Sequence, residues 1–221
     1  MAQIAEELYL LLLDNASAQP ALDRQRRERV VAAAVLLDLA YACLIRPAVA
    51  GDPVEAGLLV ALTAAVPVDP VGEPALRLLQ RRPMRPTAAV AKLRKHTEQD
   101  LVLHLERTGQ IRRVGLRTAA VGKPAHAWPL TDRHRVGDAR SALLAALFDG
   151  RPPAPSTAAI ISLLHAVDGL GALLSLNERG WRWVHARAGE IASGSWVDES
   201  PTALPEINLA ITASTLRSAL A

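Results

Sequence analysis

Apolar residues follow helical spacing over most of the chain, and one segment is apolar on every side. Val30–Ile45 is apolar throughout except for Asp38, and it follows the charged turn Arg24–Arg29. This pattern predicts a long helix over 24–45 that is buried on all sides. A membrane span needs about 20 apolar residues, so a core helix is favoured. An unpaired buried carboxylate is costly, so Asp38 predicts a structural partner, such as an arginine or the start of a neighbouring helix.

The remaining segments read as shorter helices and one hairpin. Gly109 suits a helix C-terminus, and Thr87 suits a helix N-cap. After Gly109 the helical spacing of apolar residues ends, and glycines separate β-branched residues. This pattern predicts a β-hairpin at about 110–130. We therefore expect a mainly α fold: a single helical domain, 1–221, with buried central helices and a projecting β-hairpin. The other predicted helices are 5–14, 54–66, 73–82, 88–108, 131–148, 156–168, 178–193 and 202–221.

The amino-acid composition supports this fold class and indicates the cellular compartment. Half of the residues are hydrophobic, but aromatic residues make up only 3%. Ala and Leu favour helix, whereas the residues that favour strands are few. The one cysteine, Cys43, allows no disulfide within the chain, which suits a reducing cytoplasm. We interpret Cys43 as a small buried side chain, and we expect no signal peptide because the first charged residues are acidic.

Charge is distributed unevenly along the chain. Residues 81–117 contain ten Lys or Arg and three acids, a net charge of +7, whereas the whole chain carries +3. A concentrated basic face usually meets phosphate, on lipid head groups or on nucleic acid. A second basic cluster, 24–29, alternates with acids. It is either a solvated first turn of a helix or part of the same phosphate-binding face.

No motif in the chain predicts catalysis. His96, Asp100 and His104 lie at helical spacing, but they span about 12 Å along a helix and cannot all reach one metal ion. Gly169 and Gly171 lack the third glycine of a nucleotide-binding loop, so a turn between helices is favoured. The sequence therefore predicts no enzyme, no metal and no cofactor.

Five segments follow one another along the chain: AEELYLLLLDN, VVAAAVLLDLAYACLI, LRKHTEQDLVLHLERTGQI, AWPLTD and AAIISLLHAVDGL. The order of these segments resembles the Golgi phosphoprotein 3 family, in its bacterial branch. The resemblance covers about residues 3–220 and implies a mainly helical domain with a projecting hairpin. Eukaryotic members bind phosphatidylinositol 4-phosphate on the Golgi membrane and gather glycosyltransferases by their cytoplasmic tails.

The resemblance implies a lipid site whose residues transfer only in part. The tryptophan with which the family contacts the head group aligns near Asp23 of this chain. The family's helix arginine aligns with Val31 or Ala32, and its pair of basic residues aligns with Lys95 and Glu98. Only Lys95 keeps the charge, and Glu98 is expected to repel phosphate. The candidate lipid-phosphate residues are Arg24, Arg27, Arg94 and Lys95, and those of a membrane-binding or self-associating hairpin are Arg112, Arg113, Arg117 and Lys123.

Three functions remain open from the sequence. The first is a cytoplasmic protein bound peripherally to the inner face of a membrane through anionic or phosphoinositide head groups. The second is a winged-helix DNA reader, because a basic helix followed by a basic hairpin also suits DNA. Acids on that helix favour lipid over nucleic acid. The third is an adaptor for membrane-protein tails, and self-association through the hairpin is compatible with all three.

Overall fold

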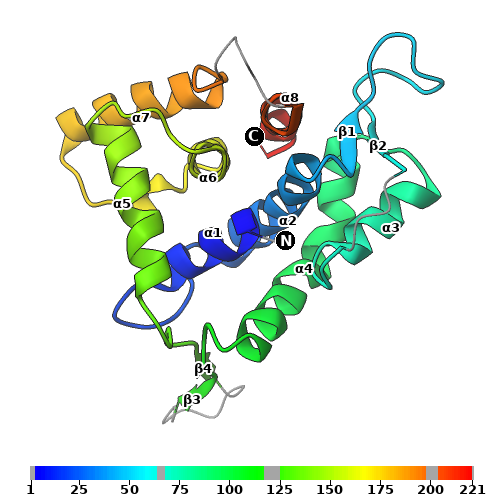
Figure 1. The fold of residues 1–221 in the computed structure, drawn as a ribbon. Coiled ribbons are helices and arrows are strands. Elements are labelled where there is room, and N and C mark those ends of the chain that lie inside the picture. Colours follow the sequence, from blue (N-terminus) through cyan, green and yellow to red (C-terminus); the bar gives the residue numbers. More distant parts are fainter. Residues whose placement is uncertain (1–2, 64–67, 117–124, 198–203, 221) are drawn as a thin grey trace.

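The computed structural model describes residues 3–63, 68–116, 125–197 and 204–220 (Figure 1). These residues form a mainly helical fold with two small antiparallel sheets, which confirms the predicted fold class. The helices are α1 (Gln3–Leu13), α2 (Arg24–Tyr41), α3 (Glu73–Arg81), α4 (Pro86–Arg107), α5 (His134–Phe148), α6 (Pro155–Ala166), α7 (Glu178–Ala192) and α8 (Leu204–Leu220), with a short 3-10 turn, η1 (Leu170–Ala172). The strands are β1 (Ile45–Pro47), β2 (Leu59–Ala61), β3 (Val114–Leu116) and β4 (Ala125–Ala127).

Helix α2 lies at the centre of the molecule, with α1, α4, α6 and α8 packed against it (Figure 1). Every residue from Val30 to Ala40 is buried, as the all-round apolar pattern predicts. The helix ends at Tyr41, earlier than predicted. Cys43 has a φ of 54°, so the chain turns there and enters β1. Cys43 is half-buried rather than fully buried.

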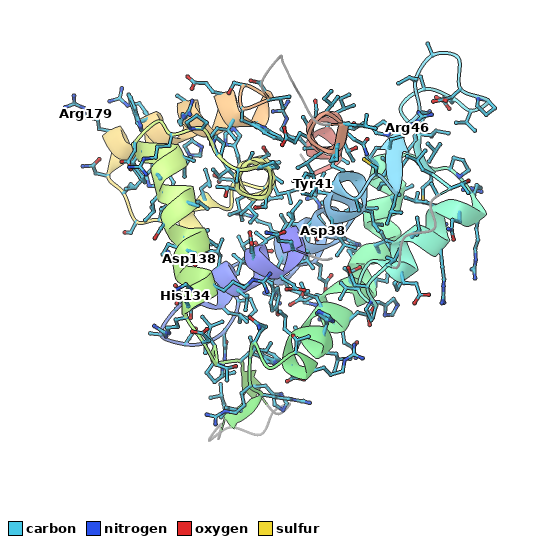
Figure 2. The ribbon with its side chains drawn as sticks, viewed as in Figure 1. Asp38, Tyr41, Arg46, His134, Asp138 and Arg179 are labelled. Atoms are coloured by element: carbon cyan, nitrogen blue, oxygen red, sulfur yellow. The ribbon has the colours of Figure 1, made fainter. Side chains whose placement is uncertain are left out.

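Asp38 joins α2 to the start of α1. Its Oδ1 accepts a hydrogen bond from the Ile4 N–H at 2.8 Å, and its Oδ2 accepts one from the Ala5 N–H at 3.0 Å. The predicted structural partner of Asp38 is therefore a helix N-terminus, where N–H groups have no partner within the helix. Burial raises the pKa of Asp38 to about 8, and the two N–H groups act in the opposite direction. Figure 2 shows Asp38 in the interior, beside the first turn of α1.

The helix predicted over 54–66 is wrong. The described part of this segment contains β2, which pairs antiparallel with β1 in the register Ile45 to Ala61. Gly57, with a φ of 84°, breaks the helical pattern before the strand. The Leu59 N–H then donates to the Met84 carbonyl at 2.8 Å. Tertiary pairing therefore decides the conformation of this short apolar run.

The predicted hairpin is confirmed, since β3 pairs with β4 and Ile111 pairs with Leu130 beyond it. It projects beside the C-terminal end of α4 (Figure 1). One capping prediction was wrong: α4 begins at Pro86, so the residue before it, Arg85, occupies the N-cap position instead of Thr87. Proline suits a first helical position because its missing N–H would have had no partner there.

Candidate functional site

A pocket of about 470 Å³ lies between the first turn of α2, the C-terminal half of α4 and the hairpin. The three elements are far apart in sequence, and their packing brings cations from all of them to one site. The pocket is the natural candidate for ligand binding because convergent polar groups line a concave surface. Its lining residues are Tyr9, Arg24, Arg27, Glu28, Lys95, Glu98, Gln99, Val102, Leu103, Glu106, Arg113 and Trp128.

The α2 wall is fixed by the way that helix begins. Asp23 caps the helix, and its Oδ1 accepts a hydrogen bond from the Arg26 N–H at 3.1 Å. The cap sets the helix register, so Arg24, Arg27 and Glu28 share one face, three and four residues apart. The second basic cluster of the sequence therefore does contribute to the basic site, through Arg24 and Arg27.

Arg27 is held in place by an ion pair across the pocket. Its Nε lies 2.6 Å from Glu98 Oε1, and the two side chains are only 16% and 18% exposed. The Tyr9 hydroxyl donates to the same oxygen at 3.1 Å. Burial, and then the neighbouring Glu98, raise the pKa of Tyr9, so its phenol stays protonated and remains a donor. Sequence reasoning treated Glu98 as a source of repulsion, whereas the fold uses it to anchor Arg27.

The α4 wall presents Lys95, but not its neighbour Arg94. Lys95 is exposed and has no hydrogen-bond or ion-pair partner within the described residues. Arg94 is half-buried and does not line the pocket. Consecutive helical residues point about 100° apart, so one helix cannot present both to the same cavity.

The hairpin contributes Arg113 and Trp128. Arg113 Nη2 lies 2.9 Å from His126 Nε2. The backbone N–H of Trp128 donates to the Ala18 carbonyl at 2.7 Å, which fixes the hairpin to the loop before α2. Arg112 is exposed but lies outside the pocket lining. The other two candidate hairpin residues, Arg117 and Lys123, lie outside the described residues.

The charge of the pocket is mixed. Four cations line it together with three carboxylates, those of Glu28, Glu98 and Glu106. Arg24 pairs with Glu28 at 2.6 Å, although the Arg24 side chain is 83% exposed and can turn toward a ligand. Sequence reasoning missed Tyr9, Trp128 and Glu106 as pocket residues, because no local pattern relates them to the basic cluster.

One of the two α4 histidines considered as metal ligands, His104, lies beside a carboxylate of α1. His104 Nε2 lies 3.1 Å from Glu6 Oε1, and Arg135 contacts the other oxygen of that carboxylate. In the part of the chain that the structure describes, no group of three His, Cys, Asp or Glu side chains could hold a metal ion. Among the same residues, no helix has both the length and the apolar character needed to cross a membrane.

A comparison with models of protein families finds a match for this chain. The family model described as Golgi phosphoprotein 3 (GPP34) matches residues 4–204, which include every described residue that lines the pocket. A search of the curated proteins finds no match.

Proposed function

The chain belongs to the Golgi phosphoprotein 3 family, and from this premise we propose that it is a non-enzymatic peripheral membrane protein. It binds acidic, phosphate-bearing lipid head groups in the pocket between α2, α4 and the hairpin. The observation that carries this proposal is the convergence of Arg24, Arg27, Lys95 and Arg113 from three elements on one cavity. Basic residues near an anionic membrane surface contribute about 1 kcal/mol each.

Apolar residues beside the pocket support contact with a bilayer. Leu103 lines the pocket and is 46% exposed, and Leu116 on β3 is 40% exposed. A leucine at the lipid interface loses contact with water, which adds to the attraction of the cations. Membrane attachment at the inner face of a cytoplasmic membrane, and recruitment of membrane-protein tails there, are part of the proposal.

Vesicle co-sedimentation tests this function. We expect the protein to sediment with phosphatidylglycerol vesicles, to sediment less at high salt because the attraction is screened, and to stay in solution with phosphatidylcholine alone. The double variant Arg24→Glu with Lys95→Glu should lose binding. The double variant Arg82→Glu with Lys92→Glu is the matched control, because it changes the net charge equally at two exposed residues outside the pocket lining.

Two results would overturn the proposal. One is equal sedimentation with neutral and anionic vesicles. The other is a loss of binding as large in the Arg82→Glu, Lys92→Glu control as in the Arg24→Glu, Lys95→Glu variant, which would mean that net charge matters and the pocket does not. Binding to duplex DNA without binding to vesicles would instead favour the winged-helix alternative.

A further inference from the structure

The three carboxylates of the pocket have different surroundings. Glu98 accepts hydrogen bonds from Arg27 and Tyr9, and Glu28 pairs with Arg24. Glu106 differs from both. Its Oε1 is covered by the surrounding protein and has no hydrogen-bond partner within the described residues. Glu106 is thus the one carboxylate of the described lining without a cation or hydrogen-bond donor.

A covered carboxylate oxygen without a donor is unfavourable, because the group has lost contact with water and gained nothing in return. Such a group in a native structure requires an explanation, and a donor supplied by a ligand is one. Glu106 also lines the pocket, so a molecule bound there lies beside this carboxylate. The donor that suits a carboxylate best is itself charged, since charge-assisted hydrogen bonds are the stronger ones.

Cations that suit a phosphate lie on the walls around Glu106. Arg113 belongs to the hairpin that follows α4, and it lies seven positions after Glu106 in the chain. Arg24 faces the same cavity from α2. Lys95, by contrast, lies about 16 Å from Glu106 along α4, at 1.5 Å per residue, so one small head group does not reach both. The Glu106 end of the pocket therefore offers sites for one negative and one positive group close together.

Trp128 adds a second feature that suits a positive group. Trp128 lines the same pocket and lies directly after β4 in the hairpin. An ammonium group over an aromatic face is attracted by the negative potential of the ring. Glu106 and Trp128 together form a site for an amine beside the arginines that hold the phosphate.

From these surroundings we infer that the preferred head group carries a protonated primary amine as well as a phosphate. This inference rests on the proposed function and specifies its ligand. The phosphate meets Arg24 and Arg113, and the amine donates an N–H to Glu106. Phosphatidylserine has this chemistry and a net negative charge. A quaternary amine does not serve, because phosphatidylcholine has no N–H to donate.

A pair of lipids with equal net charge tests the inference. Phosphatidylserine and phosphatidylglycerol each carry one net negative charge at neutral pH, but only phosphatidylserine has the amine. We expect about tenfold tighter binding to phosphatidylserine vesicles at equal mole fraction in phosphatidylcholine, the effect of one charge-assisted hydrogen bond. Free O-phosphoserine should compete for the pocket, which would show that the head group alone is recognised.

Variants locate the effect at one residue. Glu106→Gln should remove the preference for phosphatidylserine, because the amine loses its acceptor, while phosphatidylglycerol binding should strengthen because a negative charge leaves the pocket. Glu28→Gln is the matched control: it removes a pocket carboxylate that already has a partner, so it should strengthen binding to both lipids equally. Circular dichroism establishes that each variant is folded, and Glu106→Asp, which keeps the charge, should retain part of the preference.

The possible outcomes distinguish a failure of the amine inference from a failure of the proposed function. Equal binding to the two anionic lipids, above that to phosphatidylcholine, overturns the amine inference and leaves the proposed function standing. Binding to neither lipid overturns the proposed function, and the inference with it. A preference for phosphatidylserine that persists in Glu106→Gln overturns the assignment to Glu106.

Discussion

Two carboxylates on neighbouring helices, Asp38 on α2 and Glu106 on α4, have opposite surroundings. Both oxygens of Asp38 accept backbone N–H groups from α1, whereas Oε1 of Glu106 has no partner within the described residues. Asp38 lies in the core and Glu106 lines the pocket. The difference agrees with a structural role for Asp38 and with the binding role that we propose for Glu106, since native structures seldom leave covered polar groups unsatisfied without a reason.

The largest effect is expected at the core carboxylate. Asp38→Ala leaves the Ile4 and Ala5 N–H groups buried without acceptors, so the free energy of unfolding should fall by about 3 kcal/mol. Urea unfolding measures this change. Asp138→Ala is the control: Asp138 pairs with His134 on the exposed face of α5 (Figure 2), with side chains 72% and 82% exposed. Its loss should cost about 0.5 kcal/mol or less. Equal effects would mean that Asp38 is not a structural group.

The effect of Asp38→Ala on the free energy of unfolding should depend on pH. Burial raises the pKa of Asp38 to about 8, from an unfolded value of about 4. The folded state therefore holds the proton more tightly, and the contribution of Asp38 to stability is full below about pH 4 and declines as pH rises toward 8. Urea unfolding of the wild type and Asp38→Ala across this range should show the gap narrowing with rising pH. A gap that widens would contradict the direction of the pKa shift.

A smaller effect is expected at the ion pair that borders the pocket. Arg27→Met leaves the mostly buried Glu98 with Tyr9 as its remaining partner, so unfolding free energy should fall by about 2 kcal/mol. Arg24→Met removes the same charge one turn earlier, where the side chain is 83% exposed, and should cost about 0.5 kcal/mol or less. Chemical unfolding of both variants distinguishes an anchored arginine from an available one.

The smallest effect on stability is expected at Glu106. Glu106→Gln removes a charge that has no partner in the described structure, so unfolding free energy should not fall and should rise by up to about 1 kcal/mol. Thermal unfolding without lipid measures this. A fall of 2 kcal/mol or more would show that Glu106 belongs with Asp38 as a structural group, and the contrast between the two regions would disappear.

Much of the fold followed from the sequence because its signals are local. The apolar run around Asp38 predicted a buried helix, and the glycines after Gly109 predicted the hairpin. The helix predicted at 54–66 was wrong because the deciding contact is not local. A short apolar run suits a helix or a strand equally, and pairing with β1 decides between them.

The candidate site was predictable only as a list of cations. The sequence pointed to eight cations, and four of them line one pocket: Arg24, Arg27, Lys95 and Arg113. The sequence could not exclude Arg94, a neighbouring cation on the same helix whose side chain points in another direction. The family match, which covers residues 4–204, supports the family resemblance but does not distinguish among these residues.

By itself, the sequence determined the helical class, the central buried helix and the excess of positive charge in one stretch, because periodicity and charge count are properties of neighbouring residues. Only the tertiary structure decided which carboxylates are satisfied. The two hydrogen-bond donors of Asp38 lie 34 and 33 residues away in the chain, and Arg27, the partner of Glu98, lies 71 residues away. Whether a charge is paired depends on such distant contacts, and the pairing makes one acid structural and leaves another available for a ligand.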